Sequence, residues 1–196
     1  MSYSSLITYA GPGSDGAGSY GIETVTGTMA AGLAANAEIV QFRWTSATAL
    51  CSVEEISMWA GSIGAFTAGF FRFRVVPARG WTAAGTGGGT ATLTGNNAKL
   101  QTVKATTAVS QIRTATTIAL GAGTKTLDSQ GVGSIGGSVP NVAGDPLISP
   151  KGVLFSACPL QPLVLAANEG FVILATVPAT GTFTAGFNFR WSEVGL

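Results

Sequence analysis

The chain has 196 residues, which is enough for one substantial hydrophobic core, and we expect a single domain. Charged residues make up 10% of it, well below the roughly 25% of an average soluble domain. Because 46% of its residues are hydrophobic and the net charge is +1, the composition excludes an intrinsically disordered chain. A surface with so few charges favours a subunit whose surface is covered by neighbours in an assembly.

Residues 1–20 are predicted to form an extended N-terminal arm, because positions 10–19 are rich in Gly and Ser and have no periodicity. The sandwich domain would then occupy residues 21–196. Met1–Ser5 lacks the basic start of a secretory signal, and the longest apolar run, Phe171–Val177, is far too short for a membrane helix. We therefore expect no membrane partner.

After the arm, β-strand patterns dominate. Runs of alternating or β-branched residues recur at intervals of about 8–12 residues, separated by turns that contain glycine. The strands predicted from these runs are Tyr20–Met29, Ala37–Trp44, Leu50–Trp59, Phe66–Val76, Thr90–Thr94, Ala98–Thr106, Gln111–Leu120, Val153–Ala157, Leu163–Ala166, Phe171–Val177 and Phe183–Val194. One helical turn at residues 105–113 is an alternative to strand there. The pattern is typical of an all-β sandwich or barrel.

Two breaks in this succession are predicted. Pro77 lacks the N–H that a strand ladder uses, so the strand from Phe66 is expected to end at Val76. Gly, Ser, Pro and Asn cluster between Gln130 and Ser149, which predicts a long surface loop at about residues 129–152.

One seven-residue motif occurs twice, as GAFTAGF at 64–70 and as GTFTAGF at 181–187. Each copy leads into a stretch of aromatic residues and arginine. The spacing of the aromatic residues slips by one position between the copies, which a β-bulge near Gly69 or Gly186 would repair. The alternative is a chance similarity in a chain rich in Gly, Ala and Thr.

Alternation along the two motif strands predicts an inner and an outer face for each. The inner residues would be Phe71, Phe73 and Val75 in the first strand, and Phe183, Ala185, Phe187, Phe189 and Trp191 in the second. The outer residues would be Phe70, Arg72 and Arg74 in the first, and Asn188, Arg190 and Ser192 in the second.

No acidic residue lies between Glu55 and Asp128, whereas several basic residues do. These are Arg72, Arg74, Arg79, Lys99, Lys104, Arg113 and Lys125. They are too scattered for a nucleic-acid tract. They are either solvated side chains on several strands or a basic face that docks on an acidic partner.

Of the four tryptophans, Trp44, Trp59 and Trp191 lie in apolar strands and are expected in the core. Trp81 follows Gly80 in a predicted loop and is the best candidate for an exposed contact. The candidate interface residues are therefore Arg72, Arg74, Arg79, Trp81 and Arg190.

Histidine is absent, which excludes a Ser-His-Asp triad, a Cys-His dyad and any histidine-based zinc or iron site. Cys51 and Cys158 are too few for a tetrathiolate site, and we expect buried reduced thiols, although the sequence leaves a disulfide between them open. We expect neither a metal nor a cofactor.

Carboxylates are the remaining route to catalysis. Glu54 and Glu55 are the only adjacent acidic pair, and neighbours on a strand point to opposite faces. Asp128, Asp145 and Glu169 lie in or beside loops and could meet in space, where turn capping and solvation are their simpler roles. The motif G-x-G-x-x-G occurs three times, but no copy opens a helix after a strand. We expect no catalytic residue and no enzyme.

Three segments resemble structural proteins of tailed bacteriophages. They are GGGTATLTGNNAKL at 87–100, the stretch from Ile112 to Asp128, and the closing segment from Pro162 to Val194. The resemblance covers most of residues 37–194. It implies an antiparallel β-sandwich of jelly-roll type that serves as a capsid decoration (cement) protein, bound outside the shell of the major capsid protein.

We therefore expect a non-enzymatic virion subunit, made in the host bacterial cytoplasm, that stabilises the phage head. It would self-associate, with a trimer favoured, and would bind no nucleic acid. One alternative is a tail, head-fibre or baseplate component of the virion. Another is a lectin-like module that binds host glycans.

Overall fold

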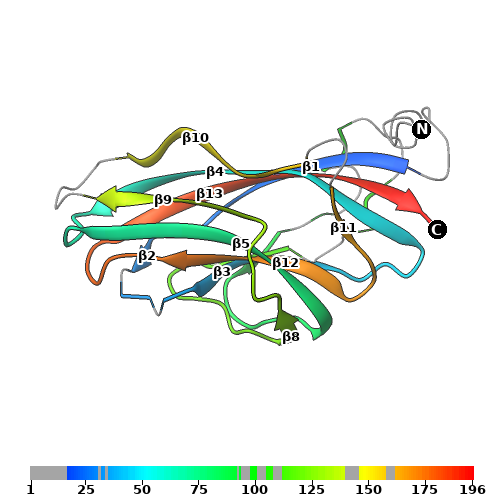
Figure 1. Cartoon of the computed structure of the whole chain (residues 1–196), viewed down its shortest axis with the longest axis horizontal. Coiled ribbons are helices and arrows are strands. Elements are labelled where there is room, and N and C mark those ends of the chain that lie inside the picture. Colours follow the sequence, from blue (N-terminus) through cyan, green and yellow to red (C-terminus); the bar gives the residue numbers. More distant parts are fainter. Residues whose placement is uncertain are drawn as a thin grey trace.

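The computed structural model describes residues 17–30, 32–33, 35–91, 93, 98–100, 105–107, 112–139, 146–157 and 162–196. All regular structure in these residues is β-strand, arranged as two antiparallel sheets that pack face to face (Figure 1). The prediction of an all-β antiparallel sandwich is confirmed. The jelly-roll connectivity remains a prediction.

The first sheet has six strands. Its main path is β1 (Ala17–Val25), β13 (Thr182–Gly195), β4 (Ala49–Gly64) and β10 (Pro146–Ser156). Two short strands extend it: β2 (Met29–Ala30) pairs with β13, and β11 (Leu163–Leu165) pairs with β4.

The second sheet has seven strands. Its path is β6 (Gly89–Thr90), β7 (Ile112–Thr114), β3 (Ala37–Trp44), β12 (Glu169–Thr176), β5 (Gly69–Ala83) and β8 (Thr124–Leu127). The strand β9 (Gly133–Val139) pairs with the first half of β5. Of the strands predicted at Thr90–Thr94, Ala98–Thr106 and Gln111–Leu120, the described parts contain only Thr90 of β6, β7 and a single bridge at Lys99.

The core lies between the sheets and is largely aromatic. Phe42 of β3 stacks on Phe171 of β12 with ring centroids 4.9 Å apart, and it meets the edge of Trp191 of β13 at 5.6 Å. The predicted inner residues of both motif strands are buried, which confirms the inner faces derived from alternation. Burial of side chains this large is the main source of stability in a sheet sandwich.

Pro77 does not end its strand, because β5 continues to Ala83. On one edge of β5, β9 pairs with Gly69–Val75 and β8 pairs with Ala78–Ala83, so Pro77 falls between two partners. The Pro77 carbonyl accepts a hydrogen bond from the backbone N–H of Asp128 at 2.9 Å, and the position that lacks an N–H faces the same gap. The predicted strand end was wrong because this proline interrupts no ladder.

The two copies of the repeated motif fold differently. In the first copy β4 ends at Gly64 and β5 begins at Gly69, whereas the second copy lies within β13 from Thr182 onward. The register shifts of β13 against β4 lie at Thr182/Phe183 and at Arg190/Trp191, and β5 pairs with β9 from Gly69 without a shift, so the bulge predicted near Gly69 or Gly186 is wrong. Because the two copies of the motif adopt different conformations, the repeat is better explained as a chance similarity than as a structural duplication.

Two predicted boundaries are also corrected. The strand β1 begins at Ala17, inside the predicted arm, and Tyr20 stacks on Trp191 at 5.6 Å. Residues 1–16 lie outside the described residues. The loop predicted at about 129–152 contains β9 and the first part of β10. Gly136 of this segment allows β9 to lie close to the backbone of β5, because a Cβ there would lie 2.6 Å from the Phe71 carbonyl oxygen. It does not form a turn.

Candidate functional site

The five predicted interface residues lie on both sides of the sandwich. Arg72, Arg74, Arg79 and Trp81 belong to β5 of the seven-stranded sheet. Arg190 belongs to β13 of the six-stranded sheet, where it alternates with the buried Phe189 and Trp191 and so points away from the core. The five residues therefore cannot form one continuous surface.

On the seven-stranded sheet, Phe70, Arg72 and Arg74 form what we call the β5 outer row. Phe70 is 56% exposed, although it is a large apolar side chain. The row lies opposite small residues of β9, namely Ser138, Gly136 and Ser134. Among the described residues, these small side chains leave Phe70 exposed to a partner, whereas Arg72 and Arg74 are half-buried.

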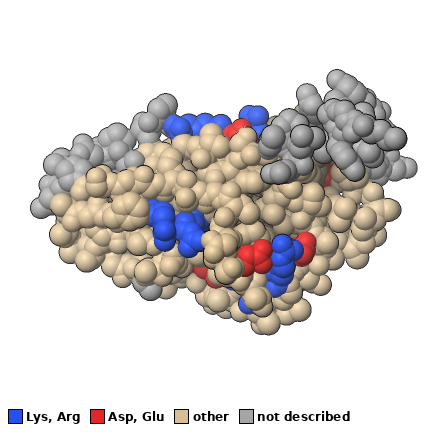
Figure 2. All heavy atoms as spheres, viewed as in Figure 1, with Lys and Arg blue, Asp and Glu red and all other residues tan. Residues whose placement is uncertain are grey.

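The two arginines of the β5 outer row have few partners within the chain. Arg72 Nη2 lies 3.5 Å from Asn36 Oδ1, and Arg72 Nε is buried without a hydrogen-bond partner. Neither Arg72 nor Arg74 forms an ion pair with any residue that the structure describes. Figure 2 shows that charged side chains form only a few small groups on the face drawn.

Trp81 is fully buried, so the prediction of an exposed contact was wrong. Trp81 lies in the second half of β5, beyond the strand end predicted at Val76. It packs in a small second cluster on the outer side of the sheet. The other members of the cluster are Val76, Ala78, Val172 and Leu174, with Leu127 of β8 half-buried against them. The chain thus covers this part of its own outer face.

Lys125 is also internal, although it belongs to the predicted basic segment. Its Nζ lies 2.8 Å from Glu38 Oε2 and 4.6 Å from the centroid of the Trp81 ring, and the two side chains of the ion pair are only 2% and 10% exposed. Gln41 Nε2 donates a second hydrogen bond to Glu38 at 2.6 Å. This lysine therefore stabilises the covered half of the face and offers no charge to a partner.

Arg79 is held between two carboxylates. Its Nε lies 3.2 Å from Asp128 Oδ1 and its Nη1 lies 2.7 Å from Glu169 Oε1. The hydrogen bond to Asp128, followed by the smaller effect of Glu169, raises the pKa of the Arg79 guanidinium. Glu169 also accepts the backbone N–H of Ala166 at 2.9 Å, which is turn capping. Asp128 and Glu169 do meet as predicted, through Arg79, whereas Asp145 lies outside the described residues.

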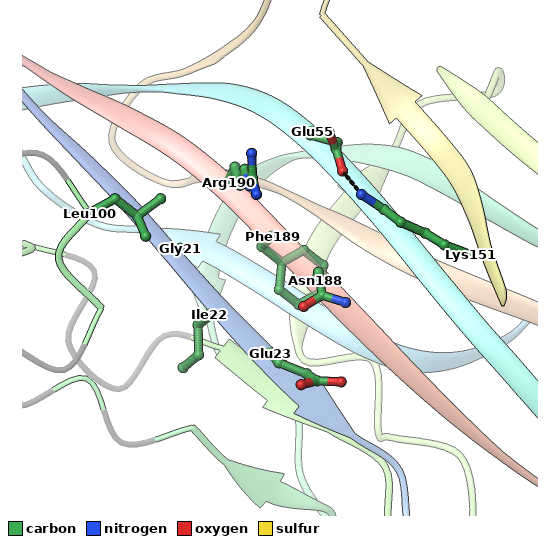
Figure 3. A pocket seen from close by; sticks show the side chains of 9 residues that line it. All are labelled: Gly21, Ile22, Glu23, Glu55, Leu100, Lys151, Asn188, Phe189 and Arg190. Carbon is green, nitrogen blue, oxygen red and sulfur yellow. Dashed lines mark hydrogen bonds and ion pairs between the residues drawn. The ribbon is translucent and has the colours of Figure 1, made fainter.

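The outer face of the six-stranded sheet carries a groove of about 380 Å³ (Figure 3). The residues that line it are Gly21, Ile22 and Glu23 of β1, Asn188, Phe189 and Arg190 of β13, Glu55 of β4, Lys151 of β10, and Leu100. Gly21 lies directly opposite Arg190 in the sheet register, and Leu100 packs over it, since a Cβ at Gly21 would lie 3.0 Å from Leu100 Cδ1. Sequence reasoning indicated only Asn188 and Arg190 here, because the groove is built by register across four strands.

Glu54 and Glu55 both lie on this outer face, contrary to the prediction of opposite faces. Trp191 of β13 pairs with Val53 while Arg190 pairs with Glu55, so Glu54 is an extra residue that forms a β-bulge. The Glu54 carboxylate accepts a hydrogen bond from the hydroxyl of Ser192, a residue of the predicted outer face that is nevertheless buried.

Glu55 accepts a hydrogen bond from Lys151 Nζ at 2.5 Å. This bond is the main reason why the pKa of Glu55 is lowered. Glu55 therefore stays ionised near neutral pH, which suits a hydrogen-bond acceptor and not a general acid.

Trp59 is not part of the groove lining, but it lies next to Glu23, which is, and it was wrongly predicted to lie in the core. It is half-buried on the outer face of β4, and its indole lies against Gly186 of β13, where a Cβ would be only 2.2 Å from the indole nitrogen. Trp59 Nε1 donates to Glu23 Oε1 at 3.3 Å. Gly186, which pairs with Trp59, has no side chain, and this allows the indole ring to lie flat against β13.

Two buried polar groups serve the fold. Burial, followed by the effects of Glu193 and Glu54, raises the pKa of the Cys51 thiol well above its ordinary value, and Cys51 is a free thiol as predicted. Cys158 lies outside the described residues. The buried Glu193 accepts hydrogen bonds from the backbone N–H of Thr107 at 3.0 and 3.1 Å, which ties residues 105–107 to β13.

Within the described ranges, His, Cys, Asp and Glu form no group of three that could hold a metal ion. No helix in the described part of the chain has the length and apolar character that a membrane crossing requires. In comparisons with protein-family models, with curated proteins and with solved structures, nothing matches the chain.

Proposed function

We propose that the chain is a non-enzymatic structural subunit of a bacteriophage virion, and specifically a decoration protein that binds the outside of the major capsid shell and stabilises the head. The observation that carries this proposal is the β5 outer row, in which exposed Phe70 lies beside two arginines without ion-pair partners among the described residues. An apolar side chain at the end of a row of two cations suits a protein surface that presents an apolar depression beside carboxylates.

The low charge of the chain supports the same proposal. Only 10% of the residues are charged, and exposed large apolar side chains occur on both sheets, among them Ile63, Phe70 and Val153. Covering such side chains in an assembly removes apolar area from water, at about 25 cal/mol per Å². The proposal includes self-association as a trimer, which sedimentation equilibrium of the purified chain tests directly.

The proposal predicts that charge reversal on the β5 outer row abolishes binding to phage heads. The test is a pull-down of the chain on purified heads that lack it, comparing the wild type with an Arg72→Glu/Arg74→Glu double variant. Arg190→Glu is the matched control, because this arginine lies on the opposite sheet. We expect the double variant to bind at least about tenfold more weakly and the control to bind like the wild type.

Wild-type binding should also weaken as salt is raised, since screening weakens exposed charge pairs. Virions that do not contain the chain would overturn the proposal. Equal binding of the wild type and the double variant would overturn the assignment of the docking face.

A further inference from the structure

We propose that the groove on the six-stranded sheet is a binding site for a neutral saccharide of one or two sugar units. Its volume of about 380 Å³ lies at the lower end of the range of small-ligand sites, about 300–1,000 Å³. The inference does not depend on the capsid proposal, because the groove and the β5 outer row lie on opposite outer faces of the sandwich.

The charges that line the groove favour a neutral ligand. Glu23 and Glu55 supply two negative charges, and Lys151 and Arg190 supply two positive charges, so the charged lining sums to zero. The hydrogen bond between Lys151 and Glu55 already uses one charge of each sign (Figure 3). A phosphate or sulfate would meet as many carboxylates as cations, whereas a neutral ligand meets no net field.

The polar groups also suit hydroxyls, each of which both donates and accepts. Asn188 offers an amide that does the same, Glu23 offers acceptors and Arg190 offers donors. Glu23 and Asn188 are directly opposite in the register of β1 and β13, and Arg190 follows two residues along β13 on the same face. The three side chains therefore lie in succession along one side of the groove (Figure 3).

Trp59 supplies an apolar surface beside these polar groups. It is half-buried, while the other three tryptophans of the chain, Trp44, Trp81 and Trp191, are fully buried. Gly186 beneath the ring lets it lie close against β13, and the hydrogen bond to Glu23 fixes it at the edge of the groove. A flat indole next to a few converging polar groups is the combination that a sugar ring needs, since it has apolar C–H faces and polar edges.

The four tryptophans make a direct experiment possible. Because Trp59 alone is partly exposed, acrylamide should quench chiefly its fluorescence, and a Trp59→Phe variant identifies that fraction. The probes are lactose, maltose, cellobiose and N,N′-diacetylchitobiose at millimolar concentrations, with inorganic sulfate and phosphate as anionic probes. We expect at least one disaccharide to lower the quenching constant about twofold and neither anion to do so.

Calorimetric titration of the disaccharide that protects Trp59 then tests the residues. Trp59→Ala and Asn188→Ala should each weaken binding at least about tenfold, whereas Phe70→Ala on the other sheet should leave it unchanged. Asn188→Ala keeps the inference testable if Trp59→Ala fails to fold. Protection by no disaccharide, protection by sulfate or phosphate instead, or binding that survives both substitutions would each overturn the proposal.

Discussion

The two outer faces of the sandwich are built in opposite ways. On the seven-stranded sheet, side chains of the edge strand β8 pack over part of the outer face, so that Trp81, Lys125 and Glu38 are buried outside the main core. On the six-stranded sheet no described residue covers the groove in this way, and its charged groups and the neighbouring Trp59 are at least partly exposed. The same residue types therefore stabilise the fold on one face and remain available to a ligand on the other.

The largest expected effect compares the two outer tryptophans. Trp81→Ala should lower the free energy of unfolding by about 4 kcal/mol, because it leaves a cavity beneath β8. Trp59→Ala should cost only about 1 kcal/mol, because that ring is half-buried and leaves no enclosed cavity. Urea unfolding of both variants measures the difference, and equal losses would contradict the contrast between the faces.

A smaller effect compares the two lysine ion pairs. Lys125→Ala leaves the Glu38 carboxylate buried without its cation, which should cost about 3 kcal/mol. Lys151→Ala removes a pair whose side chains are 50% and 26% exposed, and should cost less than about 1 kcal/mol. Thermal unfolding at matched pH tests this, and a loss for Lys151→Ala as large as that for Lys125→Ala would refute it.

The smallest effect is the pH dependence of the Glu55–Lys151 pair. The folded-state pKa of Glu55 is lowered, mainly by the hydrogen bond from Lys151, so the pair stabilises the fold above the ordinary carboxyl value of 4.5. This contribution, about 0.5 kcal/mol for an exposed pair, is lost as the pH falls through the lowered pKa. A Glu55→Gln variant should therefore be less stable than the wild type at pH 7 and equally stable in strong acid. A difference that grows towards acid would have the wrong sign.

Local pattern predicted a large part of the fold. Alternation alone identified the buried sides of β5 and β13, because the predicted inner positions are all apolar and, apart from Ala185, large. The bounds of β3, Ala37–Trp44, were also predicted correctly, since turn residues flank an uninterrupted strand pattern. Strands rich in Gly and Ser, such as β9, were missed because their place depends on a close partner strand and not on their own side chains.

The candidate sites were harder to predict because they depend on register. Nothing local to Pro77 indicates that β9 pairs with β5 before this residue and β8 pairs with β5 after it. Because Pro77 lies between the two pairing partners, β5 can continue past it to Trp81. Likewise, the bulge at Glu54 is visible only in the pairing of β4 with β13. The groove combines residues of four strands, so the sequence indicated only the outer-face residues Asn188 and Arg190 of β13 in advance.

The central claim is that the β5 outer row docks on a partner while the opposite face stays open. A cryo-EM map of the phage particle to which the proposal assigns the chain tests both parts at once. The account predicts that Phe70, Arg72 and Arg74 lie against the capsid shell and that the groove next to Trp59 faces solvent. A map in which the groove lies against the shell, or in which the shell carries no density for the chain, would contradict it.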